Sequence, residues 1–226
     1  MIVLISGIPG AGKSTVSRML ARRWPRSVHL EGDRIGEEFI VNGLMFPGEE
    51  PVEESDEQLR LRRRNTCLLA DSFAGNGFDV VVDDVILWPD GLEFYRAQLR
   101  TRPFRFVLLA PDLETVGQRD AGREKHVFEI WKHLDADMRR WTHPGLRIDT
   151  SAQTAEQTVD TILSRWDEAV VDEAVVDEAT ADEATADDPT ADQATAEHPT
   201  AGPAVLTEAT ADEATADEPA AGAAIG

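Results

Sequence analysis

The segment that most constrains this chain is residues 7–14, which read GIPGAGKS and fit the pattern G-x-x-x-x-G-K-[ST] at every fixed position. The six residues before it, MIVLIS, are an apolar run rich in β-branched side chains and too short for a helix. Residues 15–24, TVSRMLARRW, have the pattern of a helix. A strand, a glycine-rich loop and a helix in this order predict a phosphate-binding loop.

The residue types of this loop suit the phosphates of a nucleotide. Glycines let the backbone wrap closely with its N–H groups pointing inward, and the helix N-terminus adds the positive end of its dipole. Lys13 can reach the β- and γ-phosphates, and the Ser14 hydroxyl can ligate Mg²⁺. The alternative, an ordinary turn before a helix, is disfavoured by the flanking elements. The expected nucleotide-binding residues are Gly7, Gly10, Ala11, Gly12, Lys13, Ser14 and Thr15.

Apolar runs alternate with helical segments through the first 167 residues. Each run is continuous rather than alternating, which is typical of strands buried on both faces. The pattern therefore predicts one α/β domain with a parallel sheet covered by helices on both sides. After the first strand, further strands are expected at 27–33, 78–84, 104–110 and 146–150; the longer helices are expected at 56–76, 89–100, 127–141 and 152–166, with a loop at 42–55.

The last 59 residues have a different composition. All 22 Lys and Arg precede them, so residues 1–167, with 27 Asp and Glu, carry a net charge of −5, whereas residues 168–226 carry −16. From Glu168 the sequence steps in units of five such as EAVVD and EATAD, a period that makes no stable apolar stripe on a helix. We therefore expect a folded domain at 1–167 and a disordered acidic tail at 168–226. The tail is either a neutral product of repeat expansion or a segment for solubility, screening or a basic partner.

Cysteine usage and the N-terminal residues indicate the compartment. Cys67 is the only cysteine and is expected in the core, so no intramolecular disulfide can form and a reducing compartment fits. The start, MIVLISG, lacks the basic region of a signal peptide, and no apolar run approaches the length of a membrane span. We expect a cytoplasmic protein without a membrane partner; the sequence does not indicate an oligomeric state.

Three carboxylates follow expected strands, and ligands of such sheets gather at the carboxyl ends of the strands. Asp83 is expected to organise Mg²⁺, the alternative being a capping or ion-pair carboxylate. Adjacent strand residues face opposite ways, so Asp83 and Asp84 cannot share one role without a bend. Asp33 is expected to be the general base that activates an acceptor hydroxyl. Its alternative is to cap a helix beginning at Arg34.

Arginines form two groups in the sequence. Arg119 and Arg123 are four apart, so on a helix they share a face and could close over the phosphates as a lid; the alternative is a solvated basic face. Arg60 and residues 62–64 are expected to form a solvated helix face, with one arginine turned towards an anionic substrate. A nucleic-acid partner is not favoured because the folded part is net negative. Trp88 and Tyr95 could stack on a substrate ring or pack in the core.

The combination of GIPGAGKST, Asp33 after the second strand, VVVDDV and R-x-x-x-R resembles the small phosphate-loop kinases of the nucleoside-monophosphate, shikimate and gluconate kinase type. Within them, GFDVVVDDVIL is most similar to the chloramphenicol phosphotransferase group. The resemblance covers about residues 1–166. It implies a three-layer fold around a five-stranded parallel sheet of order 2-3-1-4-5, ATP with Mg²⁺ as donor, and Asp33 as the base.

The resemblance therefore predicts an enzyme, an ATP-dependent kinase that transfers the γ-phosphoryl group to a hydroxyl of a small molecule, such as an antibiotic or a metabolite. Two alternatives stay open. The first is a kinase acting on the 5′ end of a nucleotide or polynucleotide. The second is a nucleotide-binding switch without transfer activity, in which nucleotide occupancy controls a partner-binding surface.

Overall fold

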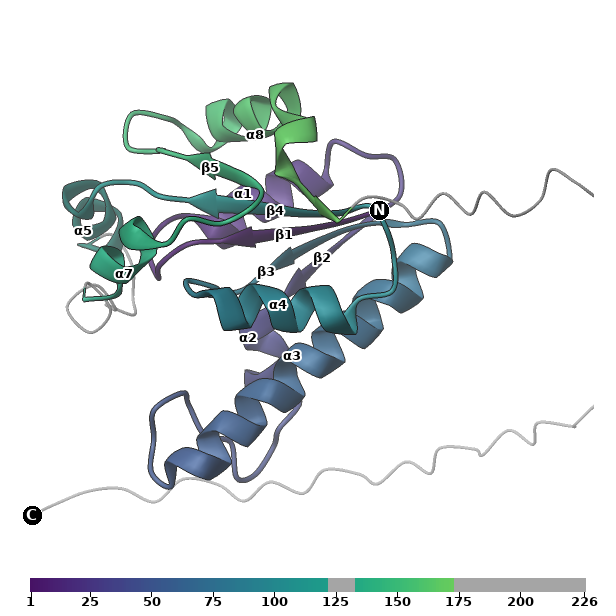
Figure 1. Cartoon of the computed structure of the whole chain (residues 1–226), viewed down its shortest axis with the longest axis vertical. Helices are drawn as coiled ribbons and strands as arrows, with labels where there is room; N and C mark the ends of the chain where they lie inside the picture. Colours follow the sequence, from purple (N-terminus) through teal and green to yellow (C-terminus); the bar gives the residue numbers. More distant parts are fainter. Residues whose placement is uncertain (122–132, 173–226) are drawn as a thin grey trace, which may run out of the picture. The chain divides into compact units, whose positions relative to one another are not determined.

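A parallel sheet forms the centre of the computed structural model, which describes residues 1–121 and 133–172 (Figure 1). Its strands follow the spatial order β2-β3-β1-β4-β5, so the expected order 2-3-1-4-5 is confirmed. The central strands are mostly apolar and almost entirely buried, as a sheet covered on both faces requires. The parallel strands are β1 (Ile2–Ser6), β2 (Ser27–Glu31), β3 (Asp79–Asp83), β4 (Phe104–Leu109) and β5 (Leu146–Ile148).

Helices cover both faces of this sheet and make the three layers expected from the sequence (Figure 1). On one face α1 (Lys13–Ala21) packs against α8 (Ala155–Ser164). On the other face α3 (Val52–Gly75) packs against β3 and against α4 (Pro89–Gln98). The shorter helices lie near the carboxyl ends of the parallel strands and are α2 (Gly32–Glu37), α5 (Leu113–Ala121) and α7 (Leu134–Arg140).

Several helix boundaries differ from the expected ones. Helix α3 begins at Val52, four residues before the expected start, and its first turn carries Glu53 and Glu54, whose charges favour a helix N-terminus. Helix α8 begins only at Ala155, because Thr154 and Gln157 form a capping box there. Of the helix expected at 127–141, the structure has α7, and residues 127–132 lie outside its description.

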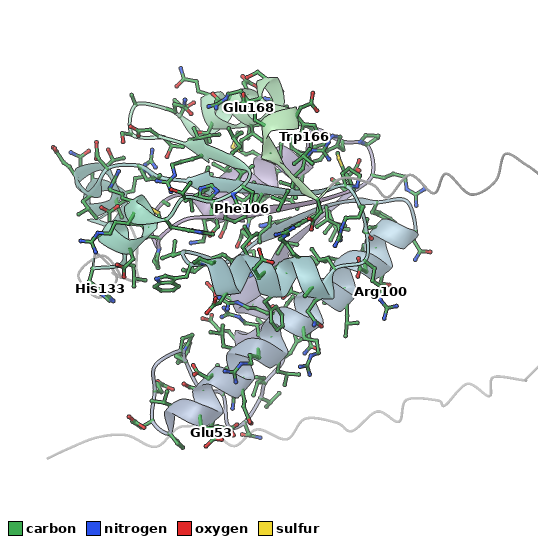
Figure 2. All side chains as sticks on the ribbon, viewed as in Figure 1. Glu53, Arg100, Phe106, His133, Trp166 and Glu168 are labelled. Atoms are coloured by element: carbon green, nitrogen blue, oxygen red, sulfur yellow. The ribbon has the colours of Figure 1, made fainter. Side chains whose placement is uncertain are left out.

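The core is built around the central strands. Side chains of β1, β3 and β4 fill it together with apolar residues of the covering helices. Phe106 of β4, labelled in Figure 2, is fully buried. Its ring centroid lies 5.8 Å from that of Trp141. Cys67 is buried in this core as expected, and its burial raises the pKa of the thiol to about 12. Within the two described ranges, no helix is long and apolar enough to cross a membrane.

The fold continues past the expected boundary at residue 167. A 3-10 turn at Trp166–Ala169 leads into a short strand, β6 (Val170–Asp172), which pairs antiparallel with Phe104 and Arg105 at the start of β4. This edge is free because β5 pairs only with Val107–Leu109. The last described residues therefore belong to the sheet, and the expected disorder concerns residues 173–226, which lie outside the description.

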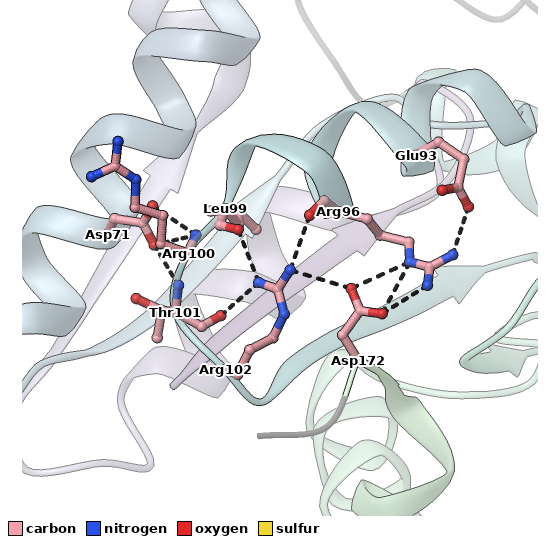
Figure 3. A network of polar contacts seen from close by, with 8 residues as sticks. All are labelled: Asp71, Glu93, Arg96, Leu99, Arg100, Thr101, Arg102 and Asp172. Carbon is pink, nitrogen blue, oxygen red and sulfur yellow. Dashed lines mark hydrogen bonds and ion pairs between the residues drawn. The ribbon is translucent and has the colours of Figure 1, made fainter. Parts of the chain in front are cut away.

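A network of charged groups fixes β6 to its surroundings (Figure 3). The Asp172 carboxylate accepts hydrogen bonds from Nε and Nη2 of Arg96 in α4, at 3.1 and 2.8 Å, and lies 3.5 Å from Nη2 of Arg102. Asp71 of α3 accepts from the backbone N–H groups of Arg100 and Thr101, at 3.0 and 2.9 Å. Asp172 thus connects the end of the described chain to α4 and to the segment before β4, and Asp71 connects that segment to α3.

Candidate active site

The phosphate loop connects β1 to α1 and requires glycine at defined positions. Gly10 and Gly12 have φ angles of 90° and 95°, in the left-handed region that favours glycine. A Cβ atom on Gly10 would lie 2.8 Å from Cγ1 of Val116, and one on Gly7 would lie 2.6 Å from the carbonyl oxygen of Leu109. The loop is therefore packed against the end of β4 and against α5 in a way that larger residues would prevent.

The start of α1 offers hydrogen-bond donors for an anion. The helix begins at Lys13, so the backbone N–H groups of its first turn have no acceptor within the helix. Their partial positive charge adds to that of the helix dipole, and together they attract phosphate. Lys13 Nζ lies 3.4 Å from the carbonyl oxygen of Ile8, across the loop. The expected nucleotide-binding residues thus lie together around one loop and one helix end.

Arg119 of α5 stabilises the phosphate loop through hydrogen bonds to backbone carbonyl groups. Its guanidinium donates hydrogen bonds to the carbonyl oxygens of Ala11, Thr150 and Gln153, at 3.3, 2.8 and 3.4 Å. It therefore joins the phosphate loop to the segment between β5 and α8, and it is half-buried rather than part of a solvated basic face. Arg123, expected to share the lid with Arg119, lies outside the described residues.

Asp83 ends β3, and its orientation is fixed by a histidine that the sequence analysis did not single out. His29 Nε2 lies 2.7 Å from Oδ2 of Asp83. The pairing of β2 with β3 sets Glu31 opposite Asp83, and two-residue alternation places His29 on the same face. That alternation was the available signal, but it becomes informative only once the pairing of the two strands is known.

The expected metal ligands fit a magnesium ion held mainly by a nucleotide. Mg²⁺ usually keeps several waters and takes one or two protein oxygens together with substrate phosphates. The hydroxyl of Ser14 and the carboxylate of Asp83 are oxygen donors of this kind. Among the residues that the structure describes, no group of three or more His, Cys, Asp and Glu side chains could hold a metal by itself. This donor set suits Mg²⁺ in the presence of phosphates better than a metal held by protein alone.

Asp84 has a different role from Asp83, because its side chain enters the layer of α3 and α4. It is fully buried and accepts hydrogen bonds from Arg62 Nη2 and Arg63 Nε, both at 3.0 Å, and from the Tyr95 hydroxyl at 3.1 Å. Burial alone would raise the pKa of Asp84, but the two guanidinium groups outweigh it and hold the pKa below its ordinary value.

This cluster corrects one sequence interpretation and decides between the two alternatives given for Tyr95. Arg62 and Arg63 do not belong to a solvated face, since their side chains are only 12% and 17% exposed and both are bound to Asp84. Tyr95 is buried in the core with its hydroxyl on Asp84, so it offers no face to a substrate ring.

Asp33 lies at the start of α2, beside the ends of β3 and β2. Helix α2 begins at Gly32, where a Cβ atom would lie 3.0 Å from the carbonyl oxygen of Asp83, so this close approach needs glycine. Glu31 occupies the N-cap position, and the capping alternative for Asp33 is therefore not supported. The Asp33 side chain is 61% exposed, and its Oδ1 accepts a hydrogen bond from Arg62 Nη1 at 2.9 Å.

A small hollow, open to solvent, lies beside Asp33. Asp33, Glu37 and Arg62 are its charged lining residues, and the remaining lining comes mostly from apolar side chains of α2, α3 and the segment between them. Arg62 thus contacts both the buried Asp84 and the exposed Asp33 at the edge of this hollow. The sequence could not predict these two contacts of Arg62, because they depend on which strands α3 packs against.

Sequence comparison assigns the chain to a family. Residues 3–141 match the AAA domain family, which is more than half of the chain. The matched range includes the phosphate loop, Asp33, Asp83 and Arg119. A comparison with curated proteins finds no match.

Solved structures with the same fold include several kinases. A sugar kinase from Janibacter sp. HTCC2649 is 20% identical with a TM-score of 0.56, and the alignment covers 74% of this chain and 95% of that one. The tunicamycin resistance protein of Deinococcus radiodurans is 18% identical with a TM-score of 0.54, covering 73% and 94%. The Mycobacterium tuberculosis APS kinase, solved with AMPPNP and APS, is 18% identical with a TM-score of 0.54, covering 74% and 96%. At these identities the likeness concerns the fold.

Proposed function

Because this chain belongs to the AAA domain family and carries a complete phosphate loop, we propose that it is an ATP-dependent phosphotransferase acting on a hydroxyl of a small molecule. One observation carries the proposal: the exposed Asp33 carboxylate borders an open hollow at the same edge of the sheet as the phosphate loop and Asp83. The kinases among its structural neighbours support the same reaction class.

Each candidate residue has a defined task in this proposal. The N-terminal end of α1 and Lys13 bind the β- and γ-phosphates of ATP, while Arg119 holds the loop in shape through Ala11. Arg123 would add a second cation over the phosphates. Ser14 and Asp83 would hold Mg²⁺, which neutralises charge on the phosphates when bound. His29 keeps the Asp83 carboxylate in one orientation.

Asp33 acts as the general base. Its carboxylate takes the proton from the acceptor hydroxyl as the hydroxyl oxygen bonds to the γ-phosphorus, and the bond from that phosphorus to the β,γ-bridging oxygen breaks to release ADP. Arg62 donates to Oδ1 of Asp33, so Oδ2 is the oxygen available for the proton.

The proposal specifies a small molecule rather than a nucleic acid. The charged lining of the hollow consists of Asp33, Glu37 and Arg62, and a polynucleotide requires several basic contacts to its phosphates. We place the reaction in the cytoplasm, in line with a single cysteine. We further propose that the acidic repeats after Asp172 form a disordered tail outside the catalytic domain.

The test measures ATP consumption across a panel of hydroxyl compounds and then compares three variants. Asp33→Asn keeps the shape of the side chain but cannot take the proton, so the acceptor-dependent rate should fall by roughly 10²-fold or more while ATP affinity and thermal midpoint stay nearly unchanged. Asp33→Ala should be as inactive as Asp33→Asn. Lys13→Ala should lose a similar factor in rate and, unlike the Asp33 variants, should also bind ATP more weakly. Full turnover in Asp33→Asn would remove Asp33 from the mechanism, and ATP binding without consumption for any acceptor would favour a nucleotide switch.

A further inference from the structure

Apolar side chains form much of the wall of the hollow beside Asp33, which also includes Gln58. Ile40, Leu44 and Phe46 line it from the segment after α2, and Leu59 lines it from α3. Phe46 remains 43% exposed. A ligand that reaches Asp33 through this hollow therefore covers apolar side chains and gains from their removal from water.

The charges of the hollow disfavour an anion. Arg62 is its only basic lining residue within the described part of the chain, and its Nη1 and Nη2 already bind Asp33 and Asp84. The Nε of Arg62 is buried, so a ligand in the open hollow cannot reach it. The other two charged lining groups, Asp33 and Glu37, are carboxylates. An anionic ligand would lie next to these carboxylates and would have to displace Asp33 from Arg62.

From these contacts we infer that the acceptor is a hydroxyl compound with an apolar body and without an anionic group. This inference rests on the proposed phosphotransferase function and names its substrate class. The hydroxyl lies at Asp33, and the apolar body lies against Phe46, Leu44 and Leu59. Sugar phosphates, nucleotides and hydroxy acids are excluded as good acceptors, because their charge finds no free basic partner among the described residues that line the hollow.

Matched pairs of alcohols test the charge requirement. One pair is methyl 4-(hydroxymethyl)benzoate and 4-(hydroxymethyl)benzoate, which share the ring and the hydroxyl and differ in one negative charge. ADP release gives kcat/KM for both members, and ligand-detected NMR with AMPPNP present gives their binding independently of turnover. The uncharged member of each pair should be preferred by about 10-fold or more, since like charges at short range repel strongly in a partly desolvated site.

Two variants with a matched control test the location. Phe46→Ala should weaken binding of the uncharged alcohols by about 3- to 10-fold through loss of buried apolar area. Phe39→Ala is the control, because Phe39 is 68% exposed and does not line the hollow. Glu37→Gln removes one of the repelling charges and should raise kcat/KM for the carboxylate member while changing the ester little.

The outcomes separate this inference from the proposed function. Preference for the uncharged members that depends on Phe46 but not on Phe39 supports the inference. Equal or better use of the carboxylates, or no binding of either member, overturns it. Phosphorylation of carboxylates that depends on Asp33 would sustain the phosphotransferase and refute the substrate class. Binding of the esters at Phe46 without any ADP release would sustain the ligand class and refute the phosphotransferase.

Discussion

Replacing Asp84 by Asn gives the sharpest test of how the end of β3 is held. The carboxylate is fully buried and accepts four hydrogen bonds, from Arg62, Arg63, the Tyr95 hydroxyl and the backbone N–H of Val85. Asparagine keeps the size but removes the charge and replaces one acceptor oxygen by a donor. Two guanidinium groups would then face a neutral amide. Arg62 would keep its ion pair with Asp33, and Arg63 would keep its hydrogen bond to the carbonyl oxygen of Val85.

The expected loss of stability follows from this geometry. Removing one partner of a buried ion pair costs about 3 to 5 kcal/mol, and the contacts that the arginines retain put this case near the lower end, at about 3 kcal/mol. For a domain of this size, that corresponds to a fall in thermal midpoint of roughly 6 to 12 °C. Asp79→Asn is the matched control, because it makes the same change at the other end of β3, where the carboxylate is 31% exposed and faces the N-terminal amine at 3.5 Å. It should cost less than about 1 kcal/mol.

Urea unfolding followed by tryptophan fluorescence measures both values, and pH adds a second signature. The folded-state pKa of Asp84 is lowered, so its stabilisation is complete above the ordinary aspartate pKa of about 3.9 and is lost as the pH falls through the folded-state value. The difference between wild type and Asp84→Asn should therefore be constant near neutral pH and should shrink below about pH 4. A loss below about 1 kcal/mol at pH 7, or one equal to that of Asp79→Asn, would refute the role assigned to Asp84.

The remaining predictions concern the chain end and the phosphate loop. Truncation after Asp172 should leave the thermal midpoint unchanged. Truncation after Asp167 removes β6, the buried Ala169 and the ion pairs of Asp172. It should lower the free energy of unfolding by about 2 kcal/mol and the thermal midpoint by roughly 4 to 8 °C. Calorimetry of both forms checks this, and equal midpoints would show that β6 adds nothing. Gly10→Ala should weaken ATP binding by about 10-fold, because an alanine Cβ is strained at a φ of 90° and would press against Val116, which distorts the loop. Gly48→Ala is the control: it has a similar φ of 88° but open space around it, so it should lose stability without losing ATP affinity. Calorimetric titration with ATP distinguishes the two, and equal affinities would contradict the loop geometry.

Local patterns were sufficient for the elements and for the phosphate loop. The G-x-x-x-x-G-K-[ST] spacing predicts a loop between a strand and a helix, and the structure has it between β1 and α1. Continuous apolar runs predict buried parallel strands, and the order came from the family resemblance. The first residues of the helices were predicted less well. The start of α3 depends on acidic residues in its first turn and the start of α8 on a capping box, and the apolar periodicity of the sequence includes neither.

The contacts between distant segments could not be predicted in the same way. Arg62 and Arg63 have the pattern of a solvated face because their partner, Asp84, lies 22 and 21 residues away, directly after β3, and only the tertiary contact between β3 and α3 brings it to them. His29 carried no signal without the β2–β3 register. The expected domain boundary missed β6 because the pentapeptide EAVVD at 168–172 has the composition of the repeats that follow, and only the free edge of β4 makes it a strand.

The position of β6 also bears on how this protein can change in length. β6 pairs with the start of β4, whereas the phosphate loop and Asp33 lie at the opposite ends of their strands, and the N-terminus lies close to the last described residues (Figure 1). Both described chain ends thus lie on the side of the domain away from the phosphate loop and Asp33. Pentapeptide units can therefore be added or removed after Asp172, or an affinity tag attached at either end, without shifting the phosphate loop or Asp33.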